Sequence, residues 1–415
     1  MIKVYLETLT CDRRGLDANK TRTYLLKNNY LIVNKPKDAD IIIFFACAAL
    51  NSITERSLKK IKKLKKYHAN LIVAGCLPEI EEERLSEIFQ GRTLSTKDLD
   101  KMDQLFPGIV QPFSTIEDAN IVFRNRADRT VQGIFRKSIQ ALPVIDAMYL
   151  WIKKDILRFI FGKSVLLYKY LQDTSTYHVR ISTGCLGECS YCAIKKGIGS
   201  CVSKPVADCL NEFEKGLKQG YTMFILDGDD TGAYGLDIHT RFPELLERIT
   251  QIPGNYAITI SNFQPVWLVK YIDDLERIFQ RNKIEGFQCP IQAGSTRILQ
   301  LMNRYSDTEK IKEALLRVKQ SSPQISVITD YILGFPAETE EDFQETLDYI
   351  KTINFDGGMV ISFSLNTGTK AENIGPKVPQ DVMKKRLKAA RHSLKHAHYH
   401  TLAVNGFKSI IFFKN

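Results

Sequence analysis

From His178 to residue 378 the sequence repeats one pattern, in which a short strand-like run is followed by a helix-forming stretch. The runs begin near His178, Thr222, Tyr256, Gly286, Ser326 and Gly357. Strands that alternate with helices favour a parallel sheet with helices packed outside it. A closed eight-unit barrel typically takes about 250 residues, so this span predicts a partial (β/α)6 barrel. Its active site should lie at the C-terminal ends of the strands.

The first hundred residues also alternate between strand and helix. Strand-like runs occupy residues 2–6, 41–45 and 71–74. This alternation predicts an open parallel α/β domain over residues 1–107. A cysteine follows each run, at Cys11, Cys47 and Cys76. Because ligands of open parallel sheets collect at the carboxyl ends of the strands, we expect these thiols to converge on one edge.

Residues 108–177 fit neither half and are predicted to be a linker. Within them, residues 141–168 are largely apolar at helical spacing, but charged residues such as Lys153 interrupt them. A membrane-spanning helix needs roughly 20 apolar residues, so this segment does not span a bilayer. We interpret it as interdomain packing, with partner docking and interfacial membrane contact as alternatives. Residues 379–415 are predicted to form a basic helix and a short tail.

Charge and cysteine content indicate the kind of partner and the cellular compartment. The net charge of +11 points to an anionic partner such as RNA. The lysines of residues 59–66 are better explained as the solvated face of a surface helix. Met1 leads directly into a strand-like run without a secretory signal, which predicts a cytoplasmic protein. In that compartment nine cysteines favour metal or redox chemistry over disulfides.

The most specific motif follows the first barrel strand, where Cys185, Cys189 and Cys192 lie within eight residues. Soft thiolates at this spacing can hold three irons of a 4Fe-4S cluster and leave the fourth iron open. A structural zinc site would need a second pair of closely spaced ligands, and none lies nearby in the sequence. The motif therefore predicts an open 4Fe-4S cluster at the barrel mouth.

This loop, with Tyr191 before its last cysteine, resembles the cluster motif of the radical S-adenosylmethionine (SAM) superfamily. The resemblance implies that SAM binds the open iron and is cleaved reductively to a 5′-deoxyadenosyl radical. It also implies a flavodoxin- or ferredoxin-type reductant. Tyr191 would pack near the adenine of SAM, and an ordinary aromatic residue at the barrel mouth is the alternative.

Other segments resemble the methylthiotransferases within that superfamily. They are Leu226 to Asp229, Ala233 to Gly235, Pro290 to Ser295, Met302 to Arg304, Thr329 to Thr339 and Gly368 to Ala371. The likeness covers roughly residues 1–105 and 178–390. It implies a second 4Fe-4S cluster on Cys11, Cys47 and Cys76, which supplies the methylthio group that replaces a substrate hydrogen. The commonest substrate of the family is a tRNA adenosine near the anticodon.

The resemblance also suggests which residues contact the cofactor. They are Tyr191, Gly228, Asp229, Gln292, Ser295, Asp330 and Gly334. The loop after Gly334 has a simpler alternative, a strand-to-helix turn in which Thr339 is the helix N-cap. The remaining cysteines, Cys201, Cys209 and Cys289, are predicted to be buried and inert.

Several positions depart from the family pattern. The family usually has Glu at position 223, Gln at 229 and Arg at 366, where this chain has Met223, Asp229 and Asn366. Its Arg-Gly and Ser-Arg pairs appear here as Lys196-Gly197 and Ser203-Lys204. Family members typically end in a small β-rich substrate-binding domain, and the sequence after Thr401 is too short to form one. A peptide, another protein or a small molecule is therefore an alternative substrate.

Two further functional hypotheses remain open from sequence. One is a radical SAM enzyme of another reaction type, in which the N-terminal cluster relays electrons or anchors the substrate. The other is a non-catalytic iron-sulfur electron carrier or sensor. The barrel and the open-site cysteine motif argue against the latter.

Overall fold

The computed structural model describes residues 1–123, 176–404 and 408–414. Its N-terminal half is a five-stranded sheet in the order β2-β1-β3-β4-β5, and all neighbouring strands are parallel. The strands are β1 (Lys3–Leu9), β2 (Leu31–Ile32), β3 (Ile41–Ala46), β4 (Asn70–Gly75) and β5 (Arg92–Ser95). The helices are α1 (Asp12–Lys27), α2 (Asn51–Leu64), α3 (Leu77–Ile80) and α4 (Glu82–Ser86), with 3-10 turns η1 (Pro36–Asp38), η2 (Thr96–Leu105) and η3 (Phe113–Thr115).

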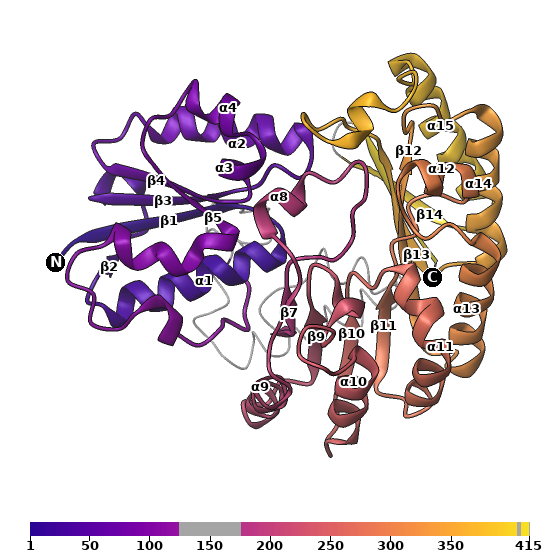
Figure 1. Ribbon diagram of the computed structural model, residues 1–415, viewed down its shortest axis with the longest axis horizontal. Helices are drawn as coiled ribbons and strands as arrows, with labels where there is room; N and C mark the ends of the chain where they lie inside the picture. Colours follow the sequence, from indigo (N-terminus) through magenta and orange to yellow (C-terminus); the bar gives the residue numbers. More distant parts are fainter. Residues whose placement is uncertain (124–175, 405–407, 415) are drawn as a thin grey trace.

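Helices cover both faces of this sheet, which explains the continuous apolar run of β3. Ile42 and Phe44 point into a core shared with α2, α3 and α4. Ile43 and Phe45 point the other way, into a core shared with α1, η2 and η3. Figure 1 shows the two helical layers above and below the strands, whose carboxyl ends point toward the second half of the molecule.

That second half is built on an eight-stranded sheet in the order β14-β15-β13-β12-β11-β10-β9-β6. Its parallel strands are β6 (Thr176–Arg180), β9 (Met223–Asp227), β10 (Ala257–Ile260), β11 (Ile284–Gln288), β12 (Ser326–Leu333) and β13 (Gly357–Ser362). The helices are α8 (Ile194–Ile198), α9 (Val206–Lys218), α10 (Phe242–Gln251), α11 (Pro265–Phe279), α12 (Thr296–Leu301), α13 (Thr308–Ser321), α14 (Glu340–Ile353) and α15 (Gln380–His396). Short elements complete it: β7 (Ser182–Thr183), β8 (Val202–Ser203), η4 (Thr231–Ala233) and η5 (Lys370–Asn373).

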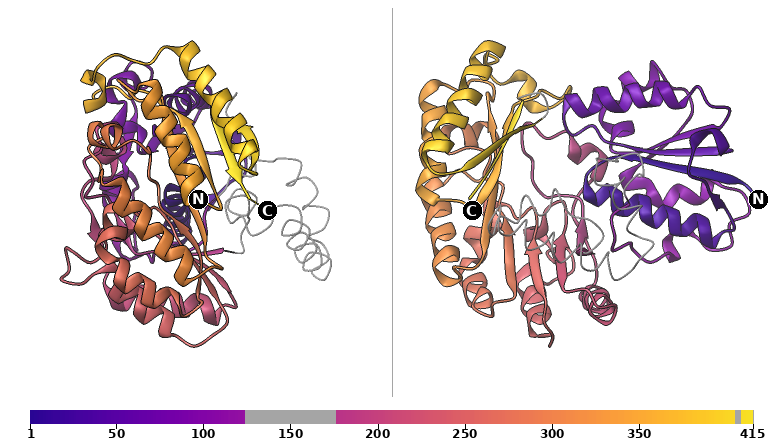
Figure 2. Two further views of the ribbon diagram at one scale, coloured as in Figure 1. Left: turned by 90° about the vertical axis from the view of Figure 1, so that its right-hand side faces the viewer. Right: turned by 180° about the vertical axis from the view of Figure 1, so that it is seen from behind.

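The parallel strands begin within three residues of the predicted positions, and the predicted α/β fold class is confirmed. Figure 2 shows the sheet as a curved, open wall with its helices on the convex side. One continuous apolar core fills the space between sheet and helices. The elements therefore form a partial barrel whose strand ends face the N-terminal half.

The C-terminal segment differs from the prediction of a helix and a tail. The helix α15 ends at His396, and the chain then forms β14 (His400–Val404) and β15 (Ser409–Phe413). The strand β15 pairs antiparallel with β13, so the hairpin extends the barrel sheet. A hairpin of this length is marginal alone, and docking on an existing edge stabilises it.

The two halves are joined through residues 108–123. The amide of Phe123 donates to the carbonyl of Gly15 in α1, and the amide of His178 in β6 donates to the carbonyl of Asn120. The predicted apolar insertion, residues 141–168, lies outside the described residues. Within the described ranges, none of the helices has the length and apolarity needed to cross a membrane.

Candidate functional site

The N-terminal cysteines owe their grouping to strand register. Leu9 pairs with Ala46, and Ala46 pairs with Gly75, so the three strands end at the same level. Cys47 and Cys76 are the next residues of their strands, and Cys11 follows β1 as the N-cap of α1. The structure thus brings the three predicted ligands to one edge of the sheet.

Their thiols are electrostatically coupled. Burial and the neighbouring thiols of Cys11 and Cys76 raise the pKa of Cys47 to about 12. Burial raises the pKa of Cys76 to about 11, although Arg14 opposes the shift. The amide of Ala49 lies 3.4 Å from the Cys47 sulfur, and the Thr96 hydroxyl lies 3.6 Å from the Cys76 sulfur.

The barrel cysteines lie on the loop between β7 and α8. The sulfur of Cys185 accepts from the Gly187 amide at 3.2 Å and from the Gln264 side chain at 3.4 Å. Burial, with Asp230 nearby, holds the pKa of Cys185 well above its usual range. Burial and the Cys189 thiol likewise raise the pKa of Cys192.

Each set offers three thiols, the ligand type that binds a 4Fe-4S cluster. In residues 1–123, 176–404 and 408–414, no three His, Cys, Asp or Glu side chains converge closely enough to bind one ion. In a four-iron cluster each thiolate binds its own iron, so its ligands stand further apart. The N–H groups at Cys47 and Cys185 are also suitable, because hydrogen bonds to sulfur stabilise the thiolate form.

Two charged residues beside the barrel cysteines were absent from the sequence prediction. Arg304 donates to the Cys189 sulfur at 3.3 Å, to the Tyr191 hydroxyl at 3.3 Å and to the Pro290 carbonyl at 2.7 Å. Asp230 is buried and lies 3.5 Å from the Cys185 sulfur. It also accepts from the Trp267 ring nitrogen at 2.9 Å. The motif Met302 to Arg304 was the available signal for Arg304.

Asp229 joins the two halves. It accepts from the Arg13 guanidinium at 2.8 Å, and Arg14 lies 3.4 Å from its other oxygen. That second oxygen also accepts from the amide of Gly184, directly before Cys185, at 3.1 Å. The contact therefore links the helix that follows Cys11 to the loop that begins at Cys185. The predicted role of Asp229 at the cofactor stays a prediction.

A second contact joins Cys76 to the barrel through α8. A side chain at Gly197 would place its Cβ 3.3 Å from the Cys76 Cα, so the backbones approach closely there. Ala193 and Ile198, at either end of α8, belong to the same apolar core as Cys76 and Leu77. Figure 1 shows α8 between the N-terminal sheet and the barrel. We call the region where the two halves meet at these cysteine loops the seam.

The other predicted cofactor residues lie at the barrel mouth. Tyr191 is half-buried, with its ring edge-on to Phe335. Gly228 is buried against the Ser182 side chain, and Asp330 accepts from Gln288 at 3.0 Å. Gln292 has a φ of 80°. A left-handed conformation of this kind is costly for a residue other than glycine and often marks a functional position.

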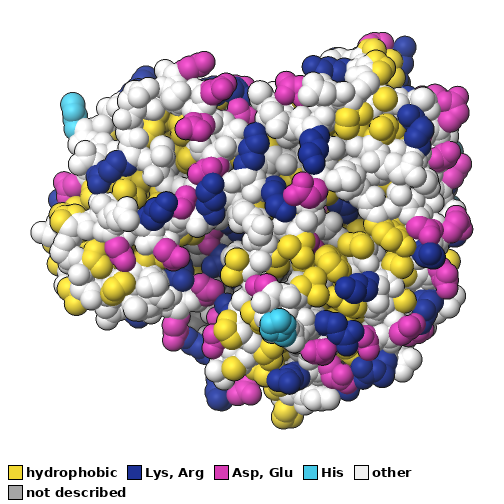
Figure 3. Space-filling view, viewed as in Figure 1, with side chains coloured by type: hydrophobic (Ala, Val, Ile, Leu, Met, Phe, Trp, Pro, Cys, Tyr) yellow, Lys and Arg dark blue, Asp and Glu magenta, His cyan; other side chains and the backbone are white. Residues whose placement is uncertain are grey.

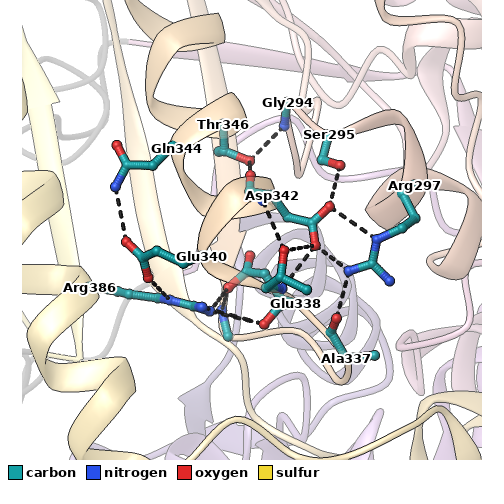
Figure 4. A network of polar contacts seen from close by, with 12 residues as sticks. Gly294, Ser295, Arg297, Ala337, Glu338, Glu340, Asp342, Gln344, Thr346 and Arg386 are labelled. Atoms are coloured by element: carbon teal, nitrogen blue, oxygen red, sulfur yellow. Dashed lines mark hydrogen bonds and ion pairs between the residues drawn. The ribbon is translucent and has the colours of Figure 1, made fainter.

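Ser295 belongs to a polar network on the helical side of the barrel (Figure 4), and Gly334 joins it through Glu338. The Ser295 hydroxyl donates to Asp342 at 2.7 Å, and the Gly334 amide donates to Glu338 at 2.7 Å. Thr339 caps α14 in a reciprocal pair with Asp342, so the alternative prediction of a helix N-cap is confirmed. Contact of Ser295 or Gly334 with a cofactor stays a prediction.

The buried end of this network is an ion pair. Glu338 accepts from the Arg386 guanidinium of α15 at 2.7 Å, and both side chains are almost fully buried. Burial raises the pKa of Glu338 to about 7, although the Gly334 amide and Arg386 oppose the shift. The predicted burial of Cys201, Cys209 and Cys289 is confirmed.

Two family models match the chain. Residues 179–350 match the radical SAM superfamily, and residues 3–95 match a family described as uncharacterized protein family UPF0004. The first match covers the cluster loop and the parallel strands β9 to β12. The second covers the part of the chain that holds Cys11, Cys47 and Cys76.

Curated relatives match over most of the chain. A tRNA-2-methylthio-N(6)-dimethylallyladenosine synthase of Thermodesulfovibrio yellowstonii is 30% identical over 92% of this chain and 81% of its own length. A ribosomal protein uS12 methylthiotransferase of a Thermotoga species is 28% identical over 93% of this chain and 81% of its own. A probable threonylcarbamoyladenosine tRNA methylthiotransferase of Pyrococcus horikoshii is 28% identical over 89% and 79%.

Solved structures support the fold. A radical SAM methyltransferase of Kitasatospora setae, with tryptophan and a SAM analogue bound, aligns with a TM-score of 0.57 at 11% identity. The alignment covers 87% of this chain and 73% of that one. At this identity the likeness concerns the arrangement of the two halves and not their chemistry.

Proposed function

This chain belongs to the radical SAM methylthiotransferases, and from that premise we propose that it inserts a methylthio group into a substrate C–H bond at the seam. It is a transferase whose cofactors are SAM and 4Fe-4S clusters. The proposal depends mainly on one observation. Two sets of three cysteines, one from the sheet edge and one from the barrel mouth, lie beside contacts across the seam, where α8 packs against Cys76 and Asp229 links Arg13 to Gly184.

We assign the cluster that cleaves SAM to Cys185, Cys189 and Cys192, and a second cluster to Cys11, Cys47 and Cys76. When bound, the clusters and SAM supply the radical that removes a hydrogen and the sulfur that takes its place. Holding the radical and the sulfur next to one substrate carbon should increase the reaction rate greatly, because the reacting groups no longer have to meet by diffusion. The reductant we propose is a flavodoxin- or ferredoxin-type protein, in the cytoplasm, where thiols stay reduced.

For the substrate we propose a tRNA adenosine. Relatives named for tRNA adenosines and for ribosomal protein uS12 cover similar shares of this chain, so their names alone do not choose between RNA and protein. The surface favours RNA. Lys196 and Lys370 are exposed beside the barrel cysteine loop, and Figure 3 shows Lys and Arg side chains near the middle of this face. Contacts between these lysines and phosphate groups would release counterions, so tRNA affinity should fall steeply with added salt.

Mass spectrometry of cells with and without this protein tests the substrate. We expect one adenosine of hydrolysed tRNA to gain a methylthio group only where the protein is present. Peptides of uS12 and small metabolites, measured in the same cells, serve as the comparison. A methylthio group that appears in a peptide instead would disprove the tRNA proposal and leave methylthio transfer intact.

A further inference from the structure

The barrel segment that follows β13, residues 363–371, contacts both cysteine loops, and we call it the bridging loop. On one side, the Asn366 side chain donates to the carbonyl of Ala49 at 3.2 Å. The Ser364 hydroxyl also accepts from the amide of Asn51 at 3.4 Å. On the other side, the amide of Ala371 donates to the carbonyl of Ser190 at 2.8 Å.

Asn366 is therefore connected to the predicted cluster ligand Cys47 through one residue, Ala49. The amide of Ala49, whose carbonyl it holds, lies 3.4 Å from the Cys47 sulfur. The residue is 5% exposed, so water competes little for this hydrogen bond. Its own carbonyl accepts from the Thr369 hydroxyl at 2.8 Å, which fixes the backbone around it.

The donor role of Asn366 follows from chemistry. Because the Ala49 carbonyl can only accept, the side-chain amide must turn its NH2 group toward it. The side-chain oxygen then faces away, and it is buried without a hydrogen-bond partner among the residues that the structure describes. An arginine, which the family usually has at this position, can also donate to a carbonyl. The change to asparagine keeps the donor and removes the charge.

We propose that Asn366 is a positioning residue that places Cys47, and with it the second cluster, relative to the cysteine loop of the barrel. This inference rests on the proposed two-cluster function. It extends that function by assigning the spacing of the clusters to one side chain of the barrel. The bridging loop fixes one cysteine loop relative to the other because its Ala371 amide also bonds to the carbonyl of Ser190, between Cys189 and Cys192.

The chain offers a comparison at the other cysteine loop in Asn303, which is exposed and has a φ of 52°. Its side chain donates to the carbonyl of Glu188 at 2.8 Å, directly before Cys189. Asn303 thus makes the same kind of bond to the barrel loop that Asn366 makes to the Cys47 loop. Replacing each by leucine removes a donor of similar size without adding charge.

The test compares Asn366→Leu with Asn303→Leu in the full-length, reconstituted protein. Hydrogen exchange of residues 48–53 should become about fivefold faster in Asn366→Leu, the ratio expected for one lost hydrogen bond, and stay unchanged in Asn303→Leu. The electron paramagnetic resonance signal of the second cluster, identified by its loss in the Cys11, Cys47 and Cys76 triple alanine variant, should change only in Asn366→Leu. Asn303→Leu should change the other signal.

Unchanged exchange and an unchanged second signal in folded Asn366→Leu would overturn the proposal, as would equal effects of both variants. If Asn366→Leu does not fold, Asn366→Asp keeps the shape but cannot donate, and it must show the same changes. A wild-type protein without a second signal would refute the two-cluster function itself. Hydrogen exchange of residues 48–53 would still report the contact in that case, so the two failures are distinguishable.

Discussion

The barrel cysteines lie within eight residues of one loop, whereas the N-terminal cysteines come from the ends of three separate strands. A short loop brings its own ligands together at small entropic cost. The N-terminal ligands meet only when β1, β3 and β4 pair in register, which fixes residues far apart in the sequence. The second set should therefore depend more on the stability of its domain and on contacts across the seam.

The polar surroundings of the two sets differ as well. A partly buried cation, Arg304, and a buried carboxylate, Asp230, lie beside the barrel sulfurs. At the N-terminal set, the sulfurs of Cys47 and Cys76 are approached by a backbone amide and a hydroxyl. Charged side chains therefore bond directly to sulfurs of the barrel set, while at the N-terminal set the charge of Arg14 opposes the rise in the pKa of Cys76.

The largest expected effect is that removing either set of cysteines abolishes its own cluster and leaves the other cluster in place. Reconstituted wild-type protein should hold about eight irons per chain, and alanine at either set of three cysteines should leave about four. The variant without Cys11, Cys47 and Cys76 should still cleave SAM to 5′-deoxyadenosine but form no methylthio product. The variant without Cys185, Cys189 and Cys192 should do neither.

Both variants must first be shown to fold by circular dichroism, because a cluster can contribute folding free energy. Cleavage of SAM by the barrel variant would contradict the assignment of the radical-generating site. Methylthio product from the N-terminal variant would favour a radical SAM enzyme of another reaction type, in which that cluster relays electrons or anchors the substrate.

The sequence predicted the local features of this site better than the long-range ones. Strand periodicity placed β1, β3, β4 and the barrel strands, and spacing identified the loop of Cys185, because both signals lie within short windows. Asp229 and Asn366 were recognised as departures from a family pattern, but their partners Arg13 and Ala49 are distant in sequence. The hairpin of β14 and β15 was missed because its stability comes from β13.

The second largest effect concerns the contact across the seam. Asp229→Ala leaves the buried guanidinium of Arg14 with Asp17 as its remaining close partner and should cost about 3 kcal/mol of unfolding free energy. We expect a chelator to remove iron from the N-terminal set first, because Asp229 holds two arginines of the helix after Cys11 and one backbone amide before Cys185. Iron loss is followed by absorbance and stability by urea unfolding.

The exposed pair of Glu247 and Arg277 provides the control for this variant. Glu247 accepts from Arg277 at 2.5 Å and from Arg281 at 2.9 Å at the surface of the barrel. Glu247→Gln should cost less than about 1 kcal/mol and leave the order of iron loss unchanged. Equal rates of iron loss from both sets in Asp229→Ala would contradict the greater dependence of the N-terminal set on the seam.

A smaller effect is a pH dependence of the free energy of unfolding, and it should arise within the barrel alone. Burial raises the pKa of Glu338 from its ordinary value of 4.5 to about 7. Between these values the folded state holds more protons than the unfolded state, so the free energy of unfolding falls as pH rises. The slope contributed by this group is at most about 1.4 kcal/mol per pH unit.

Glu338→Gln cannot titrate and should lack this slope between pH 5 and 7. Urea unfolding at several pH values, compared between the wild type and Glu338→Gln, measures the difference. The same difference should appear in the background that lacks Cys11, Cys47 and Cys76, because the pair of Glu338 and Arg386 lies within the barrel. A difference that vanishes in that background would show that the pH response depends on the N-terminal set.

The smallest expected effect is on redox potential, and its sign distinguishes the two charged neighbours of the barrel cysteines. Arg304 donates to the Cys189 sulfur, and a nearby cation stabilises the more negative, reduced cluster. Arg304→Gln should therefore lower the midpoint potential of the barrel cluster by roughly 60 mV, a tenfold change in a one-electron equilibrium. Asp230→Asn removes a negative charge beside Cys185 and should raise that potential by a similar amount.

Redox titration followed by electron paramagnetic resonance measures both clusters in one sample. The N-terminal cluster should shift far less in either variant, since neither side chain contacts its cysteines. Shifts of the same sign in the two variants would show that loop rearrangement, rather than charge, sets the potential, and equal shifts in both clusters would remove the electrostatic distinction between them.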